Sequence, residues 1–206
     1  MYDINKLYNA RVTCFEMLQD RGYTINEDDK NITFDIFQSL KASSNGLDIF
    51  ANNPSNNNSI YIKFLLNKKK LNDTDLKKET NTISKDTNNG EVYTGNPNII
   101  FVTLEKSTQN IYNSVGVGKY DNVELFVVTE LCINPSKSIY TPKHEKVPKE
   151  QEKDVLELFC KNRNSLPKIN HNDKQIRYLG LKRDDIVKIT SKNEVCGLSV
   201  SFKLIK

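Results

Sequence analysis

The segment that decides the fold reads RYLGLKRDDIVKI and runs from Arg177 to Ile189. Its middle, residues 180–185, is polar and opens with glycine, which predicts a turn that displays basic side chains. A strand is predicted directly after this turn, at residues 186–189. Further on, apolar residues alternate with polar ones, and this period of two predicts a terminal strand. Its apolar positions are Leu198, Val200, Phe202 and Leu204.

A helix is predicted upstream of these strands, from Pro148 through Cys160. Acidic residues occupy its first turns and basic residues follow its end, which is the order that the helix dipole favours. Val155, Leu158 and Phe159 are predicted to share its buried face. Helix, turn and strands together predict a small α+β domain at residues 140–206, separated from the preceding chain by a polar segment.

The first 134 residues predict an α/β domain that opens with helices. Apolar residues recur at helical spacing over residues 5–20, and Gly22 lies where a left-handed carboxyl-terminal cap is expected. A second helix is predicted at residues 33–40, with Ile36, Phe37 and Leu40 directed inward.

Four strands are predicted in the same domain. Residues 47–51 and 59–66 flank an asparagine-rich segment whose composition is typical of a hairpin loop. Residues 98–104 and 123–133 are nearly continuous apolar runs, the pattern of parallel strands buried on both faces. The polar tract at residues 67–95 has two interpretations, a thin surface helix or partial disorder. A strand, a helical crossover and a strand form a βαβ unit.

Composition excludes several classes of protein. No apolar run approaches the roughly 20 residues needed to span a bilayer, and no secretory segment is recognised, so we expect an intracellular protein without a membrane partner. The four cysteines stand singly, which predicts reduced thiols and neither a metal site nor another cofactor. Residues 140–206 hold 15 of the 30 basic and 9 of the 26 acidic side chains, so their net charge is +6 and that of the remainder is −2. This asymmetry favours an acidic partner or nucleic acid.

Four blocks of the carboxyl-terminal third carry a family resemblance. They are residues 140–144 (YTPKH), 166–169 (LPKI), 177–189 and 194–197 (EVCG). This string resembles the C-terminal domain of the fifth subunit shared by eukaryotic nuclear RNA polymerases, a family that includes a shorter archaeal relative. A second block at residues 16–23 (EMLQDRGY), preceded by Arg11, looks like the opening helix of the larger N-terminal domain of the eukaryotic and viral members.

The resemblance implies a fold, partners and a docking site. It implies an N-terminal domain at residues 1–134 similar to a restriction endonuclease without catalysis, forming part of the jaw beside downstream duplex DNA. It implies that residues 140–206 form an assembly domain, anchored to the largest RNA polymerase subunit among other polymerase subunits. DNA contact would be nonspecific, and no DNA-contact residue is carried over. The docking residues that match the family pattern are Pro142, Lys143, His144, Leu166, Pro167, Asp173, Tyr178, Gly180, Leu181, Lys182, Val187, Lys188, Glu194 and Gly197.

The sequence departs from the family pattern at several positions. Asp173 is followed by lysine where the family has proline, and Asp184 stands where the family has glycine. Ser191 and Leu198 replace arginines of the last hairpin. These departures leave individual ion pairs of the family without a counterpart here.

Catalysis finds no positive signal in the sequence. A metal-dependent nuclease needs clustered carboxylates and a lysine at a strand end, but the strand at residues 59–66 has no acid two before Lys63, and Asp48 alone cannot hold a metal. The glycines at 116 and 118 lack the spacing of a phosphate-binding loop. We therefore expect a noncatalytic subunit in transcription, with a freestanding nucleic-acid-binding or regulatory protein of the same fold as the alternative and a nuclease as a remote one.

The bias toward asparagine and lysine, with only five arginines, is typical of an A/T-rich genome. We hypothesise a large DNA virus that encodes its own polymerase, and a eukaryotic microbe with such a genome is the alternative. A viral protein would occupy the virion and the host cytoplasm, and a cellular one the nucleus.

Overall fold

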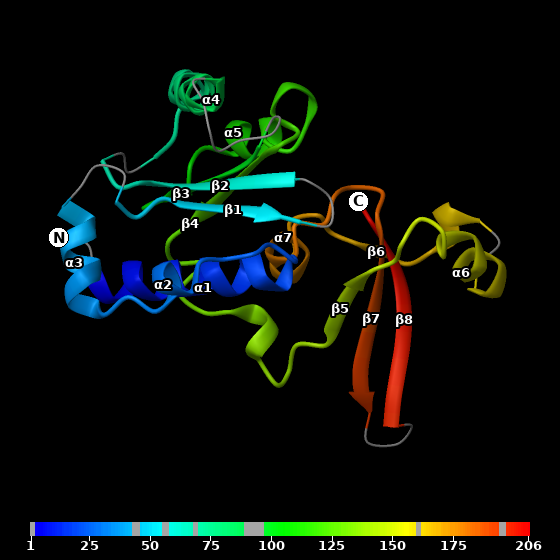
Figure 1. Ribbon diagram of the computed structural model, residues 1–206. Coiled ribbons are helices and arrows are strands. Elements are labelled where there is room, and N and C mark those ends of the chain that lie inside the picture. The colour runs from blue at the N-terminus through cyan, green and yellow to red at the C-terminus, as the bar shows by residue number, and fades with distance from the viewer. Residues whose placement is uncertain are drawn as a thin grey trace. The chain divides into compact units, whose positions relative to one another are not determined.

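The computed structural model describes residues 3–42, 46–54, 58–67, 70–88, 97–159, 162–193 and 197–206 (Figure 1). The chain divides into two compact units, which we call unit 1 (residues 1–133) and unit 2 (residues 134–206). The helices and strands of unit 1 are α1 (Ile4–Asp20), α2 (Glu27–Lys30), α3 (Phe34–Ala42), β1 (Ile49–Asn53), β2 (Asn58–Leu65), α4 (Asp73–Asn88), β3 (Asn98–Thr103), α5 (Gln109–Ser114), the 3₁₀ turn η1 (Gly118–Tyr120) and β4 (Val123–Val127).

Unit 1 is a four-stranded sheet with helices on both faces. The strand order is β1-β2-β3-β4; β1 and β2 form an antiparallel hairpin, whereas β2, β3 and β4 run parallel. Because parallel neighbours need a crossover, α4 connects β2 to β3 and α5 connects β3 to β4. Figure 1 shows α1 along one face of the sheet and α4 and α5 on the other. The predicted βαβ arrangement is confirmed, whereas the likeness to a restriction endonuclease stays a prediction.

The buried strands explain why their sequences are almost continuously apolar. Ile99 and Phe101 of β3 pack with Leu76 and Ile83 of α4, while Ile100 points to the opposite face. Burial of Leu76 and Ile83 selects the helix interpretation for residues 73–88 of the polar tract. Residues 68, 69 and 89–95 of that tract lie outside the described residues.

Helix α1 confirms the predicted helix and its cap. Asp3 accepts a hydrogen bond from the Asn5 amide at the amino-terminal end. At the other end Gly22 has φ +82°, its amide donates to the Gln19 carbonyl, and the Tyr23 amide donates to the Leu18 carbonyl. This pair of bonds is a Schellman motif, which requires a left-handed residue at the position of Gly22.

Unit 2 is a second four-stranded sheet with small helical elements. They are η2 (Pro135–Lys137), β5 (Lys143–Lys146), α6 (Glu152–Phe159), η3 (Arg163–Ser165), β6 (Lys168–Ile169), α7 (Lys174–Tyr178), β7 (Ile186–Asn193) and β8 (Gly197–Ile205). The strand order is β5-β7-β8-β6. In Figure 1 β7 and β8 form a long antiparallel ribbon, and α6 lies near the base of β8.

The sheet of unit 2 has a small core on each face. One contains Val155 of α6, Ile186 of β7 and Leu204 of β8. The other contains Ile176 of α7 and Val187 of β7. Both cores lie at one end of the β7–β8 ribbon, which we call its base. This is the end at which β6 pairs with residues 204 and 205 of β8.

Three details of the sequence prediction are wrong. Ile36 is half exposed and only Phe37 of its helix is fully buried. The strand predicted at residues 123–133 ends at Val127, where the amides of residues 130 and 131 donate back to the Val127 carbonyl and turn the chain. The helix predicted from Pro148 begins at Glu152, since residues 148–151 form a separate turn.

Within the described part of the chain, no helix has the length and apolar character that crossing a membrane requires.

Candidate subunit-docking surface

Several of the matched docking residues lie in the interior of unit 2. Leu166, Tyr178, Leu181 and Val187 are buried, with at most 8% of each exposed. Leu166 belongs to the core beside α6, whereas Leu181 and Val187 belong to the core beside α7. These four side chains support the fold and are not available to touch a partner.

Other matched residues shape the backbone around α7. Asp173 caps the amino-terminal end of α7 by accepting hydrogen bonds from the amides of Gln175 and Ile176. Gly180 has φ +65° after its other end, where the Gly180 amide donates to the Arg177 carbonyl and the Leu181 amide to the Ile176 carbonyl. This is a second Schellman motif, and glycine adopts its left-handed conformation without a steric cost.

The segment Pro142 to His144 forms a local turn and the start of β5. His144 Nδ1 lies 2.8 Å from the Pro142 carbonyl oxygen, and since a carbonyl only accepts, Nδ1 carries the proton. Lys143 pairs with Glu145 at 2.7 Å, which lowers the pKa of the Glu145 carboxyl. Gly197 has φ +75° at the start of β8.

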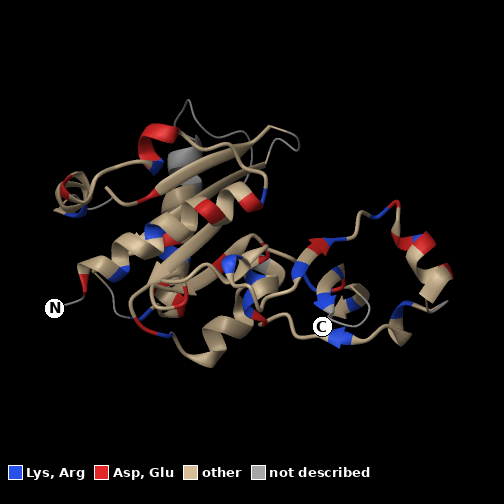
Figure 2. Cartoon of the chain, turned by 90° about the horizontal axis from the view of Figure 1, so that it is seen from below, with Lys and Arg blue, Asp and Glu red and all other residues tan. Residues whose placement is uncertain are grey.

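A set of matched residues remains at the surface. The exposed ones are Lys143, Pro167, Asp173, Lys182 and Gly197. The partly exposed ones are Pro142, His144, Gly180 and Lys188, and Glu194 lies outside the described residues. Basic residues recur along the strands of unit 2, whereas the acidic residues of α6 form a separate group (Figure 2). The accessible matched residues therefore include three lysines and one carboxylate, Asp173, which caps α7.

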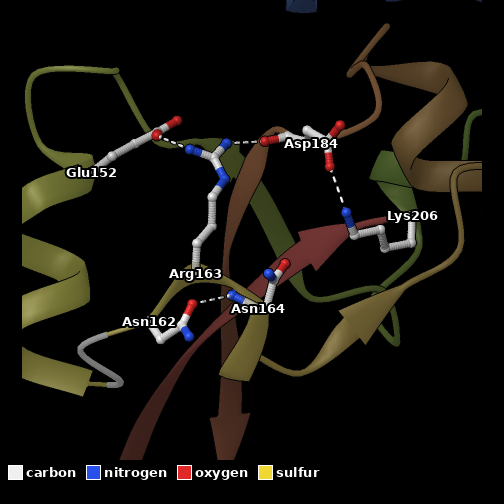
Figure 3. A network of polar contacts seen from close by, with 6 residues as sticks. All are labelled: Glu152, Asn162, Arg163, Asn164, Asp184 and Lys206. Atoms are coloured by element: carbon white, nitrogen blue, oxygen red, sulfur yellow. Dashed lines mark hydrogen bonds and ion pairs between the residues drawn. The ribbon is translucent and has the colours of Figure 1, made fainter.

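The turn before β7 is held by a network of charged groups (Figure 3). Arg163 of η3 pairs with Glu152 of α6 at 2.6 Å and donates a second hydrogen bond to the Asp184 carbonyl. Lys206 pairs with the Asp184 carboxylate at 2.6 Å, and this hydrogen bond is the main reason that the pKa of Asp184 is lowered. Sequence reasoning missed Arg163 as the centre of this network, because its partners lie 11 and 21 residues away.

Asp184 also explains the departure from the family at this position. It is the only described non-glycine residue with positive φ, at +66°. Aspartate tolerates the left-handed region better than most L-residues, and glycine adopts it freely. At the position where the resemblance implies glycine, this chain therefore has an aspartate in the left-handed conformation.

An apolar stripe lies on the surface of unit 2, and part of it contradicts a sequence prediction. Leu158 and Phe159, predicted to face the core, are 79% and 56% exposed, and Leu156 packs inward with Val155 instead. On β8, Leu198 and Val200 are 67% and 44% exposed although their strand alternates as predicted. We call Leu158, Phe159, Leu198 and Val200 the apolar stripe. The signal in the sequence was the length of the terminal strand, which continues beyond the residues that β6 covers.

The matched block at residues 16–23 has structural roles in unit 1. Arg21 forms a bidentate ion pair with Glu124 of β4, with hydrogen bonds of 2.9 and 2.7 Å. Buried Arg11 donates to the Asp29 carbonyl at 2.8 Å and lies over the Phe15 ring. These arginines join α1 to β4 and α2.

The charged residues of unit 1 that we weighed against a nuclease site contact other protein groups. Asp48 accepts hydrogen bonds from the Phe64 amide at 3.0 Å and the Tyr61 hydroxyl at 2.8 Å, and burial raises its pKa. Lys63 pairs with Glu79 of α4 at 3.0 Å. Among the described residues, no three metal-ligating side chains gather at one place.

Comparison with known proteins agrees with this two-unit organisation. The family model "RNA polymerase Rpb5, N-terminal domain" matches residues 2–83, and "RNA polymerase Rpb5, C-terminal domain" matches residues 133–205. The chain is 27% identical over 207 residues to the DNA-directed RNA polymerases I, II, and III subunit rpabc1 of Dictyostelium discoideum, covering 99% of both chains. It is 27% identical over 209 residues to the DNA-directed RNA polymerases IV and V subunit 5B of Arabidopsis thaliana, covering 98% of this chain and 91% of that one.

A shorter match is to an archaeal protein, over about the number of residues in unit 2. The chain is 36% identical over 67 residues to the DNA-directed RNA polymerase subunit Rpo5 of Methanocaldococcus jannaschii, covering 32% of this chain and 86% of that one. Fold and matches together define a two-domain protein of the transcription machinery. The chain belongs to the Rpb5 family of DNA-directed RNA polymerase subunits.

Proposed function

We propose that this chain is a noncatalytic subunit of a multisubunit DNA-directed RNA polymerase. The observation that carries the proposal is the match of both domain models of the family to successive parts of one chain. In this proposal the large subunits carry out catalysis, and this chain helps to position the downstream DNA. Asp48, Lys63 and Glu79 contact other groups of unit 1, and these contacts support a structural role for its charged residues.

In this proposal unit 2 anchors the chain to the largest polymerase subunit. Support comes from the three lysines of the matched set that the structure describes at the surface of unit 2, in contrast to its buried members, which build the fold. Lys143, Lys182 and Lys188 would meet acidic groups of the partner, because exposed lysine is a flexible point charge that suits such contacts.

Unit 1 forms part of the jaw beside downstream duplex DNA in the same proposal. The net charge of −2 on residues 1–139 means that this part of the chain by itself attracts duplex only weakly. Contact with phosphates therefore depends on placement by the assembled polymerase, and it reads no base sequence.

Affinity purification from the native source tests this function. The tagged chain is captured, washed at high salt and analysed by mass spectrometry, and two very large polymerase subunits are expected in near-stoichiometric amount. A Lys182→Glu/Lys188→Glu variant should lose them, whereas Lys149→Glu/Lys153→Glu, on and beside α6, is the control. Recovery of the wild-type chain alone, or only with nucleic acid that salt removes, would instead establish a freestanding binding protein.

The source of the chain forms a separate part of the proposal. Its lysine and asparagine bias supports an A/T-rich genome, and we assign it to a large DNA virus, with virion and host cytoplasm as its location. Sequencing of the DNA that flanks its gene tests this assignment. Neighbouring genes of a nuclear chromosome would refute it and place the protein in the nucleus.

A further inference from the structure

The outer edge of β8 is open over most of its length. On its inner side β8 pairs with β7 from Gly197 to Leu204. On its outer side β6 pairs only with Leu204 and Ile205, and Pro167 precedes β6. Within the described residues, no strand lies against the outer edge between residues 198 and 202.

The hydrogen bonds at the base of β8 show which backbone groups face this open edge. The Leu204 amide donates outward to the Pro167 carbonyl at 2.8 Å, and the Lys206 amide donates outward to the Ile169 carbonyl at 2.9 Å. The Ile205 amide donates inward, to the Asp185 carbonyl. Because these directions alternate along a strand, the amides and carbonyls of Leu198, Val200 and Phe202 also face outward.

The side chains of the same residues continue the apolar stripe. Leu198 and Val200 are largely exposed, and the Phe202 ring lies 4.9 Å from the ring of Phe159, centroid to centroid. Phe159 and Leu158 of α6 extend the apolar surface at the base of the edge. Backbone groups that can pair and apolar side chains that can pack are therefore combined along about 14 Å of strand.

Basic side chains flank the stripe on the β7 side. Lys192 is opposite Leu198 and Lys188 is opposite Phe202, and cross-strand partners project from the same face. Lys143 of β5 shares this face and neutralises Glu145, the acidic residue opposite Lys188. The surface beside the edge is thus positively charged overall, which favours an acidic occupant.

We propose that an extended segment of another polymerase subunit adds to β8 as a further strand of the sheet. It carries apolar residues at alternate positions, which cover Leu198 and Val200, and acidic residues that meet Lys188 and Lys192. This inference rests on the proposed function, and it assigns the interface to one edge of unit 2.

The composition of the edge explains why an occupant is required. Residues 197–202 read GLSVSF, without charge or proline. An exposed edge of this kind pairs readily with other chains, and proteins that leave an edge in solvent usually protect it with lysine, proline or a bulge. A strand that pairs with this edge inside the polymerase would bond to its free backbone groups and cover its alternating apolar side chains.

The first test compares three variants of the full chain in the affinity purification. Val200→Pro removes an outward amide and leaves the β7 ladder intact, and Val200→Glu places a like charge beside an acidic strand. Ser201→Glu is the matched control, because its amide faces β7 and its side chain lies on the opposite face. Both Val200 variants should retain at least tenfold less of the large subunits after the salt wash, and the control should match the wild type. Melting curves by circular dichroism establish that each variant is folded.

The second test is amide hydrogen exchange of the unmodified chain, free and within the purified polymerase. The amides of residues 198, 200 and 202 should exchange rapidly in the free chain and at least tenfold more slowly in the polymerase, while those of 199 and 201 are protected in both. Unchanged exchange on assembly, or equal loss of retention by the Ser201 control, would overturn the proposal.

Two further outcomes have distinct meanings. A free wild-type chain that sediments as a dimer, together with a monomeric Val200→Glu variant, would show that a second copy covers the edge and would overturn the choice of occupant. Failure of the wild-type chain to retain any polymerase subunit would refute the proposed function itself, and this differs from a failure confined to the Val200 comparison.

Discussion

Replacement of Arg21 by alanine should destabilise unit 1 through loss of its ion pair with Glu124. The guanidinium makes two hydrogen bonds to the carboxylate, at 2.9 and 2.7 Å, and only 6% of the Arg21 side chain is exposed. Hydrogen bonds between charged groups contribute about 1.5–3 kcal/mol each when buried. Because a third of the Glu124 side chain reaches solvent, we expect Arg21→Ala to cost about 2–3 kcal/mol in total.

The loss is measurable by urea and thermal unfolding followed by circular dichroism. For a unit of this size 1 kcal/mol corresponds to roughly 4 °C in melting temperature, so the transition of unit 1 should fall by about 10 °C. Arg21→Lys should recover less than half of the loss, since lysine cannot form the two-pronged contact.

A double-mutant cycle isolates the pair from the other contacts of Arg21. Arg21→Ala, Glu124→Ala and the double variant should show a coupling energy of about 1–2 kcal/mol. Additivity of the two single changes within about 0.3 kcal/mol would refute the argument that this ion pair joins α1 to β4.

Three other predictions concern single residues. Asp184→Gly should keep or raise the melting temperature of unit 2, whereas Asp184→Val should lower it by about 3 °C or more, because a β-branched residue is strained at φ +66°. Asp48→Ala should cost about 1–3 kcal/mol in urea unfolding, since it leaves the Phe64 amide without its acceptor. Cys14 should resist iodoacetamide at pH 8 in the native chain, measured by peptide mass mapping, because burial raises its pKa to about 12, whereas partly exposed Cys132 should react sooner.

The raised pKa of Asp48 also gives a pH dependence with a definite sign. A carboxyl whose folded pKa exceeds its unfolded value stabilises the fold below the unfolded pKa, and that contribution is lost as pH rises through the folded pKa. Asp48→Asn keeps an acceptor for the Phe64 amide and removes this titration. Its stability relative to the wild type should therefore increase from pH 4 to pH 7, and a flat difference across that range would contradict the assignment. Equal melting of the Asp184 variants and rapid native labelling of Cys14 would contradict the other two predictions.

Sequence patterns predicted most elements because local rules decide them. The cap at Gly22, the alternation of β2 and the apolar run of β3 each follow from residues close in the chain. Leu76 and Ile83 lie seven residues apart, and their spacing allowed a helix without deciding for it. Burial against β3 decided it, which depends on residues that the local pattern does not contain.

The candidate site was harder to predict because exposure depends on the rest of the sheet. Leu158 and Phe159 have the spacing of a buried face with Val155, but α6 meets the core of unit 2 through Val155 and Leu156 instead. Likewise the alternation of β8 identifies a strand and does not show where its cover stops. Family resemblance selected Tyr178 and Val187, and the structure places them in the interior rather than on a docking face.

The contacts of residues 204–206 determine when unit 2 can fold during translation. Leu204 belongs to one core, Ile205 to the other, and Lys206 bonds to the backbone of residues 169 and 171. During translation neither core of unit 2 is complete until residue 206 has left the ribosome, whereas every strand of unit 1 has emerged long before. Until residue 206 has emerged, a nascent chain therefore carries a finished first unit and an unfinished second one. A chain that lacks residues 204–206 would keep a folded first unit and lose part of both cores of the second.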